Sequence, residues 1–349
     1  MRSLRGDYRH ERAFLVAAGL IAWAVTTAGW QPAQPPTPRE LLRTVAQISD
    51  AEWTALERGE AVAKVLNTDN REIAIAGGVR IAADRERLIE RYRDIEALER
   101  SALVLAAGRF GKPPQVADLA ALPIEEYDLD LRECRPGDCK VRLGPNEIAR
   151  FQRDVDWRAV DWRERSRAVW RDTLTGYATA YTRDGRKALP TFANKPEPLP
   201  VPDELSLLVD RFAFVGAYSP EFLAYLRHFG SMPPDGTSDV LYWTKEDFGV
   251  RPVMRLQHQV IHRTPDTILV ATNQIYADHY LDASLTVTLA LDAPHTDGKP
   301  GFYMVVVNRS RTRSLNGVMR SLVRSTVRDR SREGLRKILL ATKSALERS

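Results

Sequence analysis

The sequence contains little cysteine and none of the short motifs that identify a reaction. Only two of the 349 residues are cysteine, which excludes a disulfide framework and a four-cysteine zinc site. A nucleophile elbow, a phosphate-binding loop, a dinucleotide fingerprint and a His-Glu-x-x-His motif are all missing. We therefore expect no cofactor and no bound metal. The remaining composition, 44% hydrophobic and 28% charged, is typical of a folded chain and excludes a disordered or fibrous protein.

The N-terminus has the pattern of an export signal. Residues 1–12 carry four arginines, whereas residues 13–30 carry no charged residue. A basic start followed by an apolar run is typical of a signal peptide, and this run also just reaches the length of a membrane anchor. A buried N-terminal helix of a cytosolic protein is the remaining alternative. We expect an exported protein, either periplasmic or anchored to the membrane with its main domain outside the cytoplasm. The Pro-rich segment 31–38 is expected to be a spacer.

Both cysteines lie in one short loop. Cys134 and Cys139 flank four residues that include Pro136-Gly137, a turn dipeptide that brings the two ends of the loop together. In an oxidising compartment this loop is expected to close as a disulfide. Free thiols and metal or redox chemistry are the alternatives, although zinc-binding and thioredoxin-like cysteine pairs usually have only two residues between them.

Hydrophobic periodicity predicts a mixture of helices and long strands. Ser49-Asp50 is expected to cap a short helix that ends at Gly59, and Gly77-Gly78 is expected to form a bulge or bend in a strand. The last third of the chain reads as an antiparallel meander followed by a helix to the end. The predicted strands are 61–68, 71–84, 253–263, 267–292 and 301–310, and further helices are predicted over 85–101, 146–181 and 203–229.

Two stretches resemble the START-like (SRPBCC, polyketide-cyclase) superfamily. The segment REIAIAGGVRIAADRERLIERYRDIEAL is similar to the family's opening strand and helix, and Phe302 to Glu347 is similar to its last strand, turn and closing helix. The resemblance, over about 72–100 and 238–349, implies an α+β fold with a curved antiparallel sheet packed on a long C-terminal helix around an apolar cavity. It places residues 39–112 and 238–349 in the core and leaves 113–237 as a mainly helical insertion with the cysteine loop.

A two-domain chain is the alternative to this fold. It would have a helical N-terminal half and a C-terminal antiparallel sheet with one helix. The first 110 residues would then pack independently of the last 110.

One predicted strand presents a histidine on an apolar face. By the two-residue period of a strand, His279 shares its face with apolar residues from Ile275 to Leu289, whereas Tyr, Asp and Ser residues occupy the other face. His279 is therefore a candidate ligand-orienting group or general base, with a buried structural histidine as the alternative. We expect this face to line an apolar pocket against the closing helix. The expected ligand-binding residues are Ile275, Ala277, His279, Leu281, Ala283, Met319 and Leu322.

Two other histidines lie on a neighbouring predicted strand. His258 and His262 are four residues apart, which separates them by about 13 Å along a strand, so they cannot bind one metal ion together. Either could meet His279 or Asp278 across the sheet. A His/His/Asp metal site is thus an alternative to ordinary structural histidines.

Basic residues are concentrated at the C-terminal end of the chain. The last 41 residues hold twelve lysines and arginines against three acidic residues. Arginines recur every four residues from Arg320 to Arg336, beside an apolar stripe. A basic and apolar helix suits anionic lipid headgroups, and a solvated outer face of a core helix is the alternative. Because the chain is expected to be exported, we expect a membrane surface and not nucleic acid as a partner.

These observations favour a binding function. We expect an exported or membrane-tethered protein that holds an apolar small molecule, such as a lipid or an isoprenoid-like compound, between the sheet and the C-terminal helix. An envelope enzyme of the cyclase or hydrolase type that uses His279 as a base is the first alternative. A structural envelope protein without a ligand is the second.

Overall fold

The computed structural model describes most of the chain. All described residues except Gln34 belong to one compact unit, Pro35–Ser349. The predicted signal or anchor over residues 1–30 and Met319 lie outside the described residues, and so does the side chain of Leu322. No helix within the described ranges is long and apolar enough to span a membrane. The described ranges are 34–99, 103–229, 232–247, 251–296, 298–313 and 320–348.

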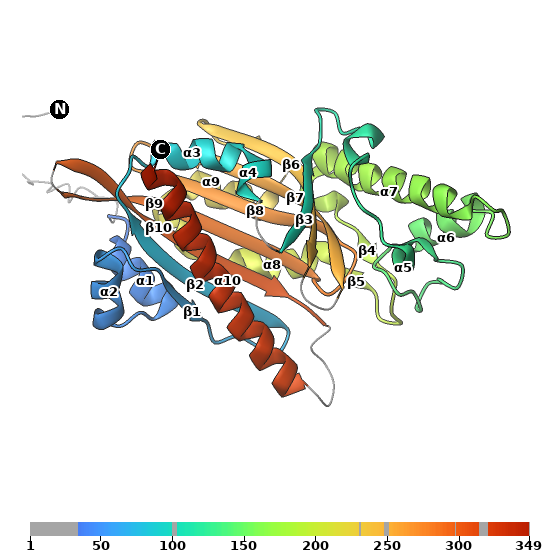
Figure 1. The fold of residues 1–349 in the computed structure, drawn as a ribbon, viewed down its shortest axis with the longest axis horizontal. Helices are drawn as coiled ribbons and strands as arrows, with labels where there is room; N and C mark the ends of the chain where they lie inside the picture. The colour runs from blue at the N-terminus through green and yellow to red at the C-terminus, as the bar shows by residue number, and fades with distance from the viewer. Residues whose placement is uncertain are drawn as a thin grey trace, which may run out of the picture. The chain divides into compact units, whose positions relative to one another are not determined.

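An eight-stranded antiparallel sheet forms the centre of this unit (Figure 1). Its order is β1-β2-β10-β9-β8-β7-β6-β3, so the early strand β2 pairs with the last strand β10. The early strand β3 pairs with β6 at the other edge, and the sheet does not close into a barrel. The strands are β1 (Val62–Val65), β2 (Glu72–Ile81), β3 (Val104–Arg109), β6 (Thr237–Asp247), β7 (Pro252–Arg263), β8 (Thr267–Ala277), β9 (Ala283–Thr296) and β10 (Lys299–Arg311).

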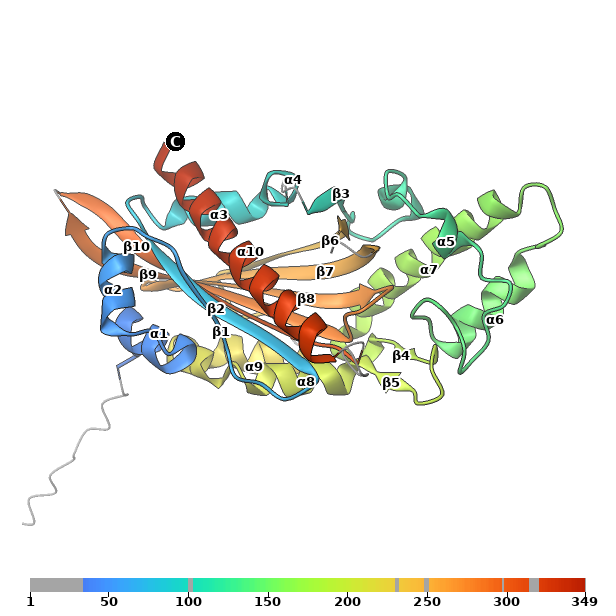
Figure 2. The same ribbon diagram turned by 60° about the horizontal axis from the view of Figure 1, so that its bottom comes forward.

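Helices cover both faces of the sheet (Figure 2). On one face, odd-numbered residues such as Leu285 and Val305 pack in a large apolar core with α1 (Pro38–Ala46), α2 (Asp50–Glu57), α8 (Val201–Asp210) and α9 (Pro220–His228). On the other face, residues such as Ala290 and Met304 pack in a smaller core with α3 (Glu86–Arg93) and the C-terminal helix α10 (Arg320–Arg348). The sheet therefore carries apolar residues on both sides.

The predicted α+β fold, a sheet packed on a long C-terminal helix, is confirmed. The two-domain alternative is wrong, because β2 forms ten residue pairs with β10 inside one sheet. Residues 113–237 are mainly helical and include α5 (Glu126–Leu129), α6 (Pro145–Asp154) and α7 (Trp162–Asp184), with a two-residue ladder of β4 (Thr191–Phe192) and β5 (Leu199–Pro200).

The prediction of one long strand over 267–292 is wrong, because the chain reverses at residues 278–282 and forms the hairpin of β8 and β9. A register shift against β7 also places consecutive residues, Ile275 and Tyr276, in the same apolar core. The alternating face assigned to residues 275–289 therefore does not exist as one surface.

The predicted bulge at Gly77-Gly78 is also wrong, since both residues keep regular register with β1 and β10. A Cβ atom on Gly77 would lie 2.2 Å from the carbonyl oxygen of Val62. Glycine is needed there because β1 approaches β2 closely.

The disulfide between Cys134 and Cys139 is present, as predicted. Gly137 adopts a φ of +89°, a backbone conformation that glycine takes without a steric penalty. The backbones of Arg135 and Asp138 form an isolated antiparallel β-bridge across the turn. The loop carries the chain towards Lys140 and Arg142, which contribute to the site described below.

We expect the Cys134→Ser/Cys139→Ser variant to lose about 2 kcal/mol of unfolding free energy, a modest amount because the two cysteines are only five positions apart. Urea unfolding of parent and variant measures the difference. Alkylation of both thiols in the native, unreduced protein would contradict the disulfide.

Candidate functional site

Four ionisable side chains meet where the segment between β3 and β6 contacts the sheet. We call Asp128, Lys245, Asp278 and His279 the charged cluster. Asp128 belongs to α5, Lys245 to β6, and Asp278 and His279 to the turn between β8 and β9. The two aspartates and Lys245 are fully buried, and His279 is 8% exposed. Burial of ionisable groups at this density costs several kcal/mol unless the groups compensate one another.

Helix α7 fixes the position of Asp128. The indole of Trp170 donates a hydrogen bond to the carbonyl oxygen of Asp128 (2.8 Å), and the hydroxyl of Ser166 donates one to the carbonyl oxygen of Leu129 (2.6 Å). A helix of four residues has no stability of its own. These two contacts therefore hold α5 against the sheet and direct the Asp128 carboxylate towards His279.

Arg142 holds the turn that carries His279. Its guanidinium donates hydrogen bonds to the carbonyl oxygens of Tyr280 and Leu281 (2.9 Å each) and to the Asp282 carboxylate (2.5 Å). Its backbone N–H donates to the carbonyl oxygen of Asp278 (2.9 Å). Tyr280 adopts a φ of 55°, which is unfavourable for a residue with a side chain. The contacts from Arg142 compensate for this conformation.

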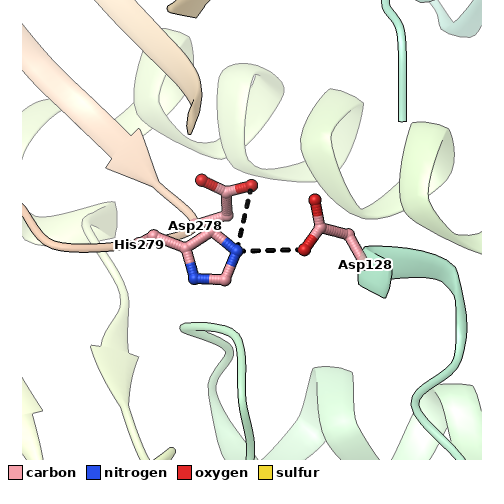
Figure 3. Close-up of side chains that lie close together, drawn as sticks. All are labelled: Asp128, Asp278 and His279. Carbon is pink, nitrogen blue, oxygen red and sulfur yellow. Dashed lines mark hydrogen bonds and ion pairs between the residues drawn. The ribbon is translucent and has the colours of Figure 1, made fainter. Parts of the chain in front are cut away.

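His279 is paired through one ring nitrogen only (Figure 3). Its Nε2 lies 3.0 Å from Oδ1 of Asp128 and 3.8 Å from Oδ2 of Asp278. Nδ1 points away from both carboxylates in Figure 3 and makes no hydrogen bond within the described part of the chain. A carboxylate that accepts a hydrogen bond from Nε2 keeps the proton on that atom, so the lone pair is on Nδ1.

Three buried polar atoms of the charged cluster have no hydrogen-bond partner among the described residues: Oδ2 of Asp128, Oδ2 of Asp278 and Nζ of Lys245. The Lys245 ammonium lies 3.7 Å from Asp128 Oδ2, close enough for charge compensation but not for a good hydrogen bond. Burial raises the pKa of Asp278 to about 7. With Asp278 neutral, the charges of Lys245 and Asp128 balance.

The donor atoms of Asp128, Asp278 and His279 also lie within 4.8 Å of one another, a spacing that suits a metal ion. A divalent cation there would lie next to the Lys245 ammonium. Because Lys245 already compensates the carboxylate charge, we assign the positive charge in this site to Lys245. Sensitivity of the activity to a chelator would distinguish a bound metal ion from this arrangement.

The other predicted ligand-binding residues do not surround His279 as one surface. Ile275 and Ala283 are buried in the large core on the face away from α10, Ala277 is fully buried, and Leu281 is partly exposed. The prediction that this face contacts the closing helix is wrong, because α10 packs on the opposite face through Leu335 and Leu339. The sheet face that carries the odd-numbered residues is the more apolar one, because the N-terminal helices α1 and α2 and the helices α8 and α9 bury it.

The sheet surface on the α10 side becomes polar away from Ala290. Ser284 and Ser310 hydroxyls lie 2.9 Å apart, and Asn308 donates a hydrogen bond to Thr286 (2.8 Å).

A cavity of about 670 Å³ does occur in the protein, but Gly144, Asp172 and Tyr177 are among its lining residues and none of the predicted ligand-binding residues is.

His258 and His262 take no part in the charged cluster. His258 contacts the Tyr181 hydroxyl (3.0 Å) and the Asp239 carboxylate (3.3 Å), whereas His262 contacts Ser219 and Thr237. The hypothesis that either one meets His279 or Asp278 is therefore wrong. The contact with His258 is the main reason that the pKa of Asp239 is lowered, and burial lowers the pKa of His262.

Family models and curated proteins offer no relative with which this geometry can be compared. No family model matches the chain, and no curated protein matches it. The functional argument therefore depends on the residues themselves.

Proposed function

We propose that this protein is an exported enzyme of the hydrolase type in which His279 acts as the general base. The observation that carries the proposal is that Asp128 pairs with Nε2 of His279 while Nδ1 stays unpaired in the described structure. A histidine oriented by a buried carboxylate can accept a proton from water or from a substrate hydroxyl. The side chain of His279 is 9% exposed, so one edge of the ring reaches solvent.

Lys245 supplies the positive charge of the proposed site. The Lys245 ammonium lies 3.7 Å from the Asp128 carboxylate, so the two opposite charges compensate one another in a buried position. When His279 accepts a proton, the Asp128 carboxylate 3.0 Å away stabilises the imidazolium. A preformed ion pair of this kind needs no reorganisation at the moment of proton transfer.

Export is supported by two features of the chain. The basic and apolar pattern of residues 1–30 is typical of an export signal. The Cys134–Cys139 disulfide is typical of an oxidising compartment. The exposed Arg332 and Arg336 of α10 suit an anionic membrane surface as a partner.

The test is the release of p-nitrophenol from a panel of p-nitrophenyl esters and phosphates. We expect His279→Gln to reduce the rate by about 10²–10⁴-fold, the usual contribution of a general base. His228→Gln is the matched control, because His228 is an exposed histidine at the end of α9 and should not affect the rate.

Two outcomes would contradict this function. The first is a folded parent protein that hydrolyses no member of the panel. The second is a rate that is abolished by a chelator and restored by Zn²⁺ or Mn²⁺, which would assign Asp128, Asp278 and His279 to a metal ion. An unchanged rate in the presence of a chelator supports Lys245 as the source of positive charge.

Binding of an apolar ligand remains a second proposal. The observation that favours it is the antiparallel sheet packed on a long C-terminal helix, the arrangement implied by the START-like resemblance. Mass spectrometry of small molecules extracted from the natively purified protein tests it. Co-purification of a lipid would support binding, and its absence together with turnover dependent on His279 would leave only the enzyme.

A further inference from the structure

Two cations lie over one exposed aromatic ring next to the charged cluster. Tyr127, the residue before Asp128, is 43% exposed. The Lys140 ammonium lies 4.0 Å from the centroid of the Tyr127 ring, and the Arg251 guanidinium carbon lies 3.3 Å from it. The ring is therefore a platform that holds two positive charges at the protein surface.

Neither cation is paired with a carboxylate in the described structure. Other arginines near this site are paired: Arg132 with Asp130, and Arg163 with Glu126. Partial burial lowers the pKa of Lys140, whereas the nearby carboxylates of Asp130 and Asp128 raise it. Because neither cation has an ion pair of its own among the described residues, both can still bind an anion.

The two cations come from segments that are held in place. Lys140 directly follows Cys139 of the disulfide. Arg251 lies just before β7, where the N–H of Met254 donates a hydrogen bond to the Asp278 carboxylate and the carbonyl oxygen of Met254 accepts one from the N–H of Asp278. The Tyr127 ring lies 6.4 Å from the His279 ring. An anion held by both cations would therefore lie beside the proposed general base.

We propose that Lys140 and Arg251 bind a phosphate monoester group of the substrate, an inference that rests on the proposed function of His279. Two positive charges match the double negative charge of a phosphate monoester. The planar guanidinium of Arg251 can bind two phosphate oxygens at once, and the Lys140 ammonium acts as a point charge. The phosphate can belong to a soluble ester or to the headgroup of a lipid.

Direct binding measurements test this proposal without depending on turnover. Isothermal titration with glycerol 3-phosphate measures the soluble source, and flotation with phosphatidylcholine vesicles that contain or lack phosphatidic acid measures the lipid source. We expect Lys140→Gln and Arg251→Gln each to weaken binding about tenfold, the effect of losing one charge-assisted contact. Binding should also weaken as the salt concentration rises.

Arg132→Gln is the matched control, because it removes an equal charge nearby from an arginine already paired with Asp130. We expect it to change binding less than twofold, whereas an equal loss in all three variants would indicate a general effect of charge and would overturn the proposal. Circular dichroism of each variant shows that the fold is retained.

The proposal and the proposed function fail in different ways. If neither phosphate source binds but p-nitrophenyl ester hydrolysis still depends on His279, the phosphate site is wrong and the enzyme stands. His279→Gln should keep phosphate binding unchanged and lose turnover. Binding by the parent that Lys140→Gln and Arg251→Gln both leave unchanged would place the phosphate elsewhere.

Discussion

Lys245→Met should lower the free energy of unfolding by about 3–5 kcal/mol, the usual cost of removing one partner from a buried ion pair. Lys245 is fully buried, and its ammonium lies 3.7 Å from the fully buried carboxylate of Asp128. Without the ammonium, the buried Asp128 carboxyl has only His279 as an ionisable partner. Methionine retains most of the aliphatic side chain, so the loss cannot come from a large cavity. Urea unfolding at neutral pH measures the effect.

Two further variants separate charge from packing. Lys337→Met removes an exposed lysine of α10 and should change stability by less than about 0.5 kcal/mol. The double variant Lys245→Met/Asp128→Asn removes both charges and should recover most of the loss, which a double-mutant cycle expresses as a coupling energy. If Lys245→Met is as stable as the parent, Asp128 is not ionised and the proposed site is wrong.

Much of the fold follows from local patterns in the sequence. Ser49 caps α2 as predicted, since its side chain accepts a hydrogen bond from the N–H of Glu52 (3.2 Å). Strands β7 and β10 and helix α10 lie where the runs of β-branched residues and the helical period predict them. Each of these signals depends on neighbours within a few residues, so it survives in the folded protein.

The reversal between β8 and β9 had only a weak signal. Residues 278–282 contain no Gly, Pro or Asn, and their two turn-favouring residues, Asp278 and Asp282, also fit the alternation of a strand. The turn is stabilised instead by Arg142, which lies more than 130 positions earlier in the chain. A contact of that sequence separation cannot be inferred from a local pattern, and the same holds for the register shift at Ile275.

The candidate site was predictable only in part. His279 was identified from its sequence surroundings, although the face assigned to it was wrong. Asp128 gave no local signal, because its contacts are with α7 and with the sheet residues Lys245 and His279, all distant in the sequence. Lys245 had a signal that the prediction did not use: Leu241, Trp243 and Lys245 alternate along β6, which places a lysine on an apolar face. A buried charge on such a face indicates a partner, and here that partner is Asp128.

The stability of the protein should fall as pH rises from about 4 to about 7, because burial raises the pKa of Glu99 to about 7 and does the same for Asp278. The pKa of the Asp278 carboxyl is raised by burial to about 7 in the folded state, against about 4 when the chain is unfolded. Between these values the folded chain holds a proton that the unfolded chain has lost, so raising the pH favours unfolding. The difference between the folded and unfolded pKa of Asp278 corresponds to about 4 kcal/mol of stability, fully lost above pH 7.

Asp278→Asn should remove the part of this dependence that comes from Asp278 and leave the part that comes from Glu99. Asparagine has the shape of the protonated aspartate, its oxygen can still accept the N–H of Met254, and its amide can donate to Asp128 Oδ2, which has no partner among the described residues. The variant should match the parent near pH 4 and exceed its stability by up to about 4 kcal/mol near pH 8. Asp235→Asn, at an exposed position, is the control and should follow the parent at every pH. Urea unfolding across this range measures all three proteins.

A constant difference in stability between the parent and Asp278→Asn would mean that Asp278 is ionised throughout this pH range. The charged cluster would then carry a net negative charge unless His279 were protonated, and a protonated imidazole could not serve as the general base.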